Sequence, residues 1–144
     1  MPRIQGHPVG NFSFLVEMSD AGATGFAEMS GLDIETEVLE YRDGNSVGGV
    51  RKFPGLHRSG DVTFKRGVAT SFEMWDWYKT VLSGKPERRD VVISLLNSDK
   101  EAIAQWRLFN AWPRKYSGPV LNARGNEIAI EEIVIVSERM ELLD

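Results

Sequence analysis

The chain has 144 residues and a mass of 16.2 kDa, and its 42% hydrophobic and 26% charged residues are typical of one globular domain, residues 1–144. Its formal charge of −4 disfavours a general attraction to nucleic acid. It has no cysteine, which excludes disulfides and thiolate metal sites, and no apolar run approaches the ~20 residues that span a bilayer. We therefore expect a soluble protein without stable nucleic-acid or membrane binding.

The N-terminal part of the chain is typical of β-structure. In "NFSFLVEM", Phe12, Phe14, Val16 and Met18 recur at every second position, which predicts a strand with one buried face. The small residues of "DAGATG" predict a turn, and "FAEMSGLDIETEVLEYR" predicts a short strand, a kink at Gly31 and a longer strand.

A glycine-rich segment follows this longer strand. The residues from Arg42 to Gly60 include five glycines among 19 residues, together with Pro54, and they contain few apolar anchors. This composition predicts a long, mobile loop or hairpin over about residues 41–60. Loops of this length are usually functional or become ordered against a partner.

One helix is predicted over about residues 71–83, after a short strand that contains Val62 and Phe64. Thr70 and Glu73 have the spacing of a capping box, and Gly84 has the position of a C-terminal cap. At ~100° per residue, the arc that we expect to face a sheet contains Phe72, Met74, Trp75, Tyr78, Val81 and Leu82. The arc that we expect to face solvent contains Glu73, Asp76, Thr80 and Ser83.

The C-terminal part of the chain again predicts strands. The segments "DVVISLLN" and "AIAQWRLFNAW" flank the turn "SDKE" as a hairpin, and "NEIAIEEIVIVSER" predicts one closing strand. The residues of the second hairpin strand that we expect on one face are Ala102, Ala104, Trp106, Leu108 and Trp112. Six or seven strands and one helix predict a mainly β (α+β) fold, a small antiparallel β-barrel or sandwich with a flanking α-helix.

The sequence offers no catalytic, cofactor-binding or metal-binding residues. His7 and His57 have no partner at metal-ligand spacing, and acid pairs such as Glu131 with Glu132 are typical of solvated strand faces. Two alternative functions remain open on the residues alone. One is a monomeric carbohydrate-binding β-module that stacks sugars on Trp112 and Tyr116. The other is a small hydrolase that uses paired carboxylates.

Four segments in order carry a resemblance to a known family: "GFAEMSGLDIETEVLEYRDG", "RKFPGLHRSGDVTFKRG", "FEMWDWYKTVLSGK" and "NAWPRKYSGPVLNARGNEIAIEEI". Together they resemble the tail tube proteins of contractile-tailed bacteriophages and of phage-tail-like contractile injection systems, over about residues 9–137. The resemblance implies a structural protein, not an enzyme. Its subunits would form hexameric rings that stack into a hollow inner tube, and sheath contraction would drive this tube into a target.

The resemblance also implies partners and contact residues. The implied partners are further copies in a homo-hexameric stack, the sheath, baseplate and terminal cap proteins, and transient protein or DNA cargo in the lumen. Assembly would take place in the bacterial cytoplasm. Implied contacts between subunits and rings are Tyr41, Arg42, Asp43, Asn45, Val50, Arg51, Lys52, Phe53 and Arg58. An implied assembly loop between the last two strands contains Asn110, Trp112, Lys115, Tyr116, Asn122 and Asn126, and Glu35 and Glu37 are candidate lumen-facing acids.

Overall fold

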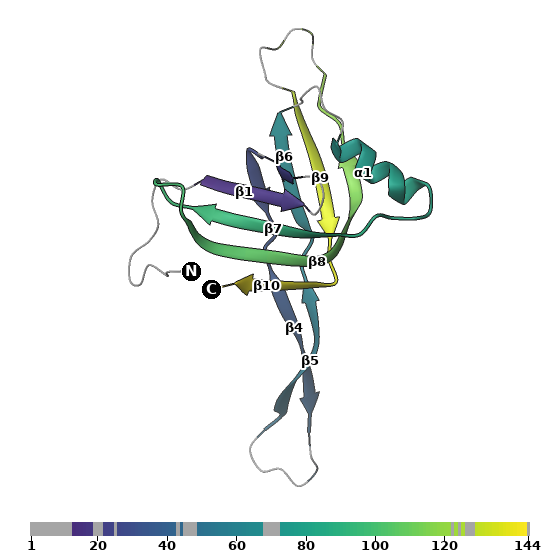
Figure 1. The fold of residues 1–144 in the computed structure, drawn as a ribbon. Coiled ribbons are helices and arrows are strands. Elements are labelled where there is room, and N and C mark those ends of the chain that lie inside the picture. Colours follow the sequence, from purple (N-terminus) through teal and green to yellow (C-terminus); the bar gives the residue numbers. More distant parts are fainter. Residues whose placement is uncertain are drawn as a thin grey trace.

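The computed structural model describes residues 13–18, 22–24, 26–42, 44, 49–67, 73–121, 123, 125 and 129–143. These residues form ten strands and one helix (Figure 1). The elements are β1 (Ser13–Met18), β2 (Gly22–Thr24), β3 (Glu28–Ser30), β4 (Ile34–Tyr41), β5 (Arg51–Ser59), β6 (Val62–Gly67), α1 (Glu73–Leu82), β7 (Arg89–Leu96), β8 (Ala102–Ser117), β9 (Ile130–Val136) and β10 (Arg139–Leu143).

Eight strands form an antiparallel sheet system that we call the body. Their order is β2-β1-β7-β8-β9-β6-β3, and β10 also pairs with β8. The long strand β8 pairs with β7 and β10 through its first part and with β9 through its last part. It thereby joins two layers that cross each other in Figure 1, one with β1 and β7 and one with β6 and β9.

The core lies between these two layers and confirms the predicted alternation. Val16, Met18, Val62 and Phe64 are buried, as period-2 patterns in β1 and β6 predict. The remaining buried apolar side chains come mainly from the later strands, and they include Val91, Ile93, Leu108, Ala111, Ile133 and Ile135. The described strands end in the edges β2 and β3 and do not close into a barrel, so the sandwich form of the prediction is the one that the fold adopts.

The predicted helix is present, and its C-terminal cap is confirmed. Gly84 has a φ of +86°, and its N–H donates to the Val81 carbonyl oxygen at 3.0 Å. Helix α1 contacts β8 in the body. Thr70 and Phe72 lie outside the described residues, so the predicted capping box and the burial of Phe72 stay predictions.

The predicted buried face of the helix is confirmed for Met74 but wrong for Trp75 and Leu82, and the prediction missed Trp77. Met74 and Trp77 are the buried residues of α1, whereas Trp75 is 38% exposed and Leu82 is 63% exposed. Trp77 is held inside because its indole N–H donates to the Glu87 carbonyl oxygen at 2.7 Å. Thr80, predicted to face solvent, is half-buried because its hydroxyl donates to the Trp77 carbonyl oxygen and accepts the Glu87 N–H.

Of the predicted loop or hairpin over about residues 41–60, the hairpin form is present, because β5 pairs with β4. Two corrections concern the other strands. Strand β10 follows β9 instead of one continuous closing strand. The expectation that Trp112 shares a face with Leu108 is also wrong. Asn110 between them has a φ of +51°, and Ala111 and Pro113 point into the core after it. A residue in the left-handed region changes the face on which the following side chains of the strand lie. The periodicity of the sequence does not show this change.

Candidate assembly interface

Strands β4 and β5 form a two-stranded sheet that we call the arm, and it projects from the body (Figure 1). They pair antiparallel, with Ile34 opposite Ser59 at the base and Tyr41 opposite Arg51 far from the base. The pairing shifts between Thr36 and Val38, where β5 contains one more residue than β4. This bulge divides the arm into a proximal and a distal segment, and bulges increase the local twist of a ribbon.

The arm's direction is set where it leaves the body. Gly31 has a φ of +97°, and a Cβ at this position would collide with the Asp61 carbonyl oxygen. Two hydrogen bonds of 2.7 Å, from the Asp33 N–H to the Gly31 oxygen and from the Gly60 N–H to the Asp33 oxygen, close the base. The Arg114 guanidinium then joins Asp61 to β8 at 2.8 Å. The predicted kink at Gly31 is therefore confirmed.

Both faces of the arm are exposed to solvent. Every residue of β4 is exposed, and seven of the 13 exposed large apolar side chains in the described part of the chain belong to this region. They are Ile34, Val38, Leu39, Tyr41, Val50, Phe53 and Leu56. An isolated two-stranded ribbon is marginally stable in water, so this apolar exposure indicates a surface that another molecule covers.

The register assigns the arm side chains to two faces. Leu39 lies opposite Phe53, and Tyr41 lies opposite Arg51 on the same face two residues further along. We call Leu39, Tyr41 and Phe53 the distal arm patch. On the opposite face of this segment, Glu40 lies opposite Lys52 and Val38 lies opposite Pro54. The distal segment thus has one mainly apolar face and one mixed face.

The candidate contact residues of the arm are largely brought together. Those in the described part are all exposed, namely Tyr41, Arg42, Val50, Arg51, Lys52, Phe53 and Arg58. Asp43 and Asn45 lie outside the described residues. The sequence prediction missed Leu39 and Leu56, because the sequence does not show that these apolar residues of β4 and β5 stay exposed in the folded chain.

The candidate lumen-facing acids are in the proximal segment. Glu35 lies directly opposite Arg58, and Glu37 lies on the same face two residues along. These three side chains line a small polar cleft of about 120 Å³. Two carboxylates and one guanidinium give this surface a net charge of −2 + 1 = −1, less than the acids alone suggest.

The predicted assembly loop is not a loop in its first half. Asn110, Trp112, Lys115 and Tyr116 all belong to strand β8, and the segment connects β8 to β9 instead of the last two strands. Asn122 and Asn126 lie outside the described residues. The loop assignment came from the family resemblance, whereas in this chain β8 continues to Ser117 and its Pro113 is buried.

Asn110 marks the bend at which β8 passes from one layer to the other. Its backbone N–H donates to an Asp90 carboxylate oxygen at 3.1 Å, and its side-chain amide donates to Glu138 at 2.9 Å. Arg107 also donates to Asp90, at 2.7 Å. The pKa of Asp90 is held below its usual value mainly by the hydrogen bond from Arg107 and, to a smaller extent, by the hydrogen bond from Asn110. These contacts fix the shape of the subunit rather than forming a ligand site.

A buried ion pair lies beside helix α1. Arg66 is 8% exposed and Glu131 is 6% exposed, and the Arg66 Nε donates to the Glu131 Oε1 at 2.7 Å. The Tyr116 hydroxyl donates to the other Glu131 oxygen at 2.7 Å. The pKa of Tyr116 is raised mainly by burial and, to a smaller extent, by this hydrogen bond. The interpretation of Glu131 as part of a solvated acid pair is therefore wrong.

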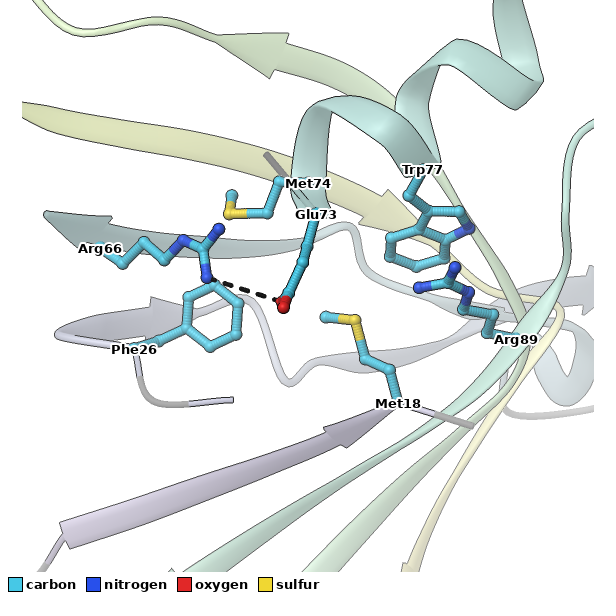
Figure 2. A pocket seen from close by; sticks show the side chains of 7 residues that line it. All are labelled: Met18, Phe26, Arg66, Glu73, Met74, Trp77 and Arg89. Carbon is cyan, nitrogen blue, oxygen red and sulfur yellow. Dashed lines mark ion pairs between the residues drawn. The ribbon is translucent and has the colours of Figure 1, made fainter. Parts of the chain in front are cut away.

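The same arginine also faces the start of the helix. Figure 2 shows Arg66 from β6 beside Glu73 of α1, and the Arg66 Nη1 to Glu73 Oε2 distance is 4.0 Å. The Arg89 guanidinium lies 4.9 Å from the centre of the Trp77 ring. The cavity between these residues has a volume of about 10 Å³, which is room for about one water molecule. This region therefore joins the helix to the sheets and is too small for a substrate.

The geometry does not support a sugar-stacking platform on Trp112 and Tyr116. Trp112 pairs with Val136 and Tyr116 pairs with Ile133, three residues apart on β9. An odd separation along a strand places the two rings on opposite faces of the sheet. Tyr116 is in addition half-buried and packs on Trp75, with ring centres 5.4 Å apart.

The chain combines a β-sandwich, a flanking helix and a projecting ribbon with exposed apolar side chains, an arrangement that suits a subunit of a larger assembly. The family model for the T4-like virus tail tube protein gp19 matches residues 10–141. The chain therefore belongs to the tail tube protein family, and it is a structural protein of phage tails or phage-tail-like particles.

Solved structures support this assignment. A chain of the anti-feeding prophage cap, described as the AFP tube terminating cap, is 30% identical with a TM-score of 0.87, covering 99% of this chain and 95% of that one. A chain of the sheath-tube complex of PVC, an extracellular contractile injection system, in the extended state is 33% identical with a TM-score of 0.85, covering 95% and 92%. A type six secretion system protein shares the fold at 7% identity, with a TM-score of 0.57 and coverages of 91% and 82%.

No curated protein matches the sequence. Within the described residues, no helix has both the length and the apolar character needed to cross a membrane.

Proposed function

We propose that this chain is the inner-tube subunit of a contractile injection system, forming hexameric rings that stack into a hollow tube. The tube would assemble in the bacterial cytoplasm and conduct protein or DNA cargo when the sheath contracts. Family membership and the likeness to chains from the PVC and anti-feeding prophage particles support this function. The 33% identity to a chain of PVC, an extracellular contractile injection system, favours an injection particle over a phage tail.

The arm is the observation that carries the proposal. Its exposed apolar side chains and its two unpaired outer strand edges are stable in water only when neighbours cover them. A contact between two different surfaces of identical subunits closes into a ring when its rotation permits, and stacked rings then extend as an open polymer. We place at these joints the exposed contact residues of the arm, namely Tyr41, Arg42, Val50, Arg51, Lys52, Phe53 and Arg58.

The partners follow from the same assignment. The PVC relative comes from a sheath-tube complex, and the anti-feeding prophage relative comes from a cap that terminates the tube. We propose that this chain likewise lies inside a sheath and ends at a baseplate and a terminal cap. The candidate assembly residues of β8 would act indirectly, because Asn110 and Tyr116 hold the bend and the core that position the contact surfaces.

We further propose that Glu35 and Glu37 face the lumen, where carboxylates would repel passing DNA. Changing both residues to lysine should leave ring formation intact and retain DNA in the tube, measured as nuclease-protected DNA that copurifies with assembled particles. Equal DNA retention by the wild type and the variant would contradict a luminal position.

Assembly is tested by electron microscopy of the purified chain together with light scattering over a concentration series. We expect rings of about 6 × 16.2 kDa ≈ 97 kDa, or hollow stacks of such rings. A monomer at every concentration, also in the presence of baseplate and sheath proteins, would contradict the proposed function.

Limited trypsin digestion provides a second test of the arm's role. Arg51 and Lys52 are exposed in the single chain, and contact with neighbours should protect them in the assembled tube. The control is the Arg51→Gln, Lys52→Gln variant, which identifies the fragments that come from these sites. Cleavage at an unchanged rate after assembly would show that the arm is not part of the joint.

A further inference from the structure

An apolar groove in the body lies open to solvent near the base of the arm. The groove extends from the core between the two layers. The short edge strand β3 lies on one side of it, and strands β1, β7 and β8 lie on the other. Its volume is about 280 Å³, near the lower limit for small-molecule pockets and suited to a few inserted side chains. The apolar residues that line it are Phe14, Met29, Leu32, Ile93, Leu95 and Trp106.

We propose that the groove receives the distal arm patch of a second copy of this chain. The inference rests on the proposed tube assembly and identifies the surface that accepts the arm. Leu39, Tyr41 and Phe53 are 52%, 56% and 47% exposed, so about half of the surface of each residue is in contact with solvent in the single chain. Burying such large apolar side chains is a main source of affinity in interfaces between subunits.

The arm cannot fill the groove of its own chain. Leu32 lines the groove and Leu39 belongs to the arm patch, seven residues further along an extended segment. At ~3.3 Å per residue these two surfaces lie roughly 20 Å apart, and the arm points away from the body (Figure 1). A second copy displaced along the arm would bring its groove to the patch, and the same contact can then repeat from copy to copy.

The charges at the two surfaces are complementary. Glu28, at the rim, is the charged residue among those that line the groove, and its side chain is 66% exposed. Arg51 is the charged residue beside the arm patch, on the same face as Phe53. The carboxylate of Glu28 has only a loose contact with Lys65, at 3.9 Å, so it remains accessible to a guanidinium. An ion pair at the rim would set the register of the inserted arm.

The absence of cysteine from the chain allows a direct crosslinking test. Glu28→Cys and Arg51→Cys chains are mixed, assembled, and treated with a short thiol-reactive crosslinker. We expect a covalent heterodimer of 2 × 16.2 kDa ≈ 32 kDa. The control replaces Glu28→Cys by Lys85→Cys, an exposed position just after helix α1, and should give little heterodimer.

Paired substitutions test each surface separately. Phe53→Glu should raise the concentration at which assembly begins by about tenfold or more, because aromatic anchors dominate interface affinity. Leu82→Glu, which introduces the same charge at an exposed apolar residue of helix α1 outside the arm, is its control. Ala27→Arg, which obstructs the groove from an exposed lining position just before β3, should have the same effect. Ser30→Arg, at the exposed end of β3 and outside the groove lining, should not.

The outcomes separate this inference from the proposed function. Two outcomes would place the arm on another surface and overturn the inference while leaving the proposed function intact. One is that rings or tubes form without the covalent heterodimer. The other is that Ala27→Arg is tolerated whereas Phe53→Glu prevents assembly. Assembled tubes with a still accessible groove would assign the groove to a different partner, again against the inference. Failure of the unmodified chain to assemble would overturn both.

Discussion

Strand β9 in the body and strand β5 in the arm show how differently two strands of one chain are stabilised. β9 has seven residues between two neighbouring strands, and Ile133 and Ile135 are completely buried. β5 has nine residues and one neighbour, and it is exposed along almost its whole length. The body therefore contains the interactions that stabilise the single chain, whereas the exposed side chains of the arm are available for contacts with another molecule.

This contrast has a physical consequence for mutations. A buried side chain in the body contributes through apolar area and packing in every molecule, assembled or not. An exposed apolar side chain of the arm contributes little until a neighbour covers it. Stability of the monomer and strength of assembly should therefore respond to different sets of residues.

The largest effect on monomer stability should come from Trp77. Trp77→Ala removes a fully buried ring and the hydrogen bond to Glu87, and we expect a loss of about 3–5 kcal/mol in the free energy of unfolding. Trp75→Ala is the matched control on the same helix. It loses the ring contacts with Tyr78 and Tyr116 and should cost about 1 kcal/mol. Equal losses in urea denaturation would contradict the observed helix face.

The next largest effect concerns the buried ion pair. Glu131→Ala leaves the Arg66 guanidinium buried without its carboxylate partner, and removal of one partner costs about 3 kcal/mol or more. Glu132→Ala, one residue along and on the opposite face of β9, should change stability by less than about 0.5 kcal/mol. Thermal denaturation of both variants measures the difference, and similar melting temperatures would show that the pair is not structural.

A smaller, pH-dependent effect should come from Asp90. Its pKa is lowered in the fold by the hydrogen bonds from Arg107 and Asn110, so its carboxylate stabilises the protein above the ordinary pKa of ~4. That stabilisation disappears as the pH falls through the lowered pKa. Asp90→Asn should therefore be less stable than the wild type at pH 7, by about 1 kcal/mol for partly exposed groups, and this difference should be smaller at pH 2.

Urea midpoints of the two proteins at both pH values measure this difference. A difference between Asp90→Asn and the wild type that stays constant from pH 7 to pH 2 would exclude the carboxylate as its source.

The parts of the body with local signals were predictable from the sequence. Val16, Met18, Val62 and Phe64 alternate with more exposed residues, and Gly84 has the position that a helix cap requires. These features depend on neighbouring residues, so a single sequence contains the information for them.

Features that depend on distant partners were not predictable. Glu131 resembles a solvated acid until Arg66, 65 residues earlier, pairs with it. Trp75 and Trp77 lie ~200° apart around the helix, so both sides offered an aromatic residue and periodicity did not choose between them.

β5 lacks a burial pattern because neither face is covered within one chain, and its glycine and proline left a loop and a hairpin as equal alternatives. The contact residues on the arm came from resemblance to a family, whereas the distal arm patch needed the strand register.

The smallest effect on the monomer should come from the arm itself. Phe53→Ala removes a side chain that is 47% exposed and lies opposite Leu39, so its removal should lower the free energy of unfolding by less than about 0.5 kcal/mol. In assembly the same ring would be buried against a neighbour, and its loss should weaken ring or tube formation by a factor of ten or more. Urea denaturation of the monomer and sedimentation of assembled material measure the two effects separately. A large loss of monomer stability would mean that the arm is part of the folding unit, and the contrast between body and arm would then fail.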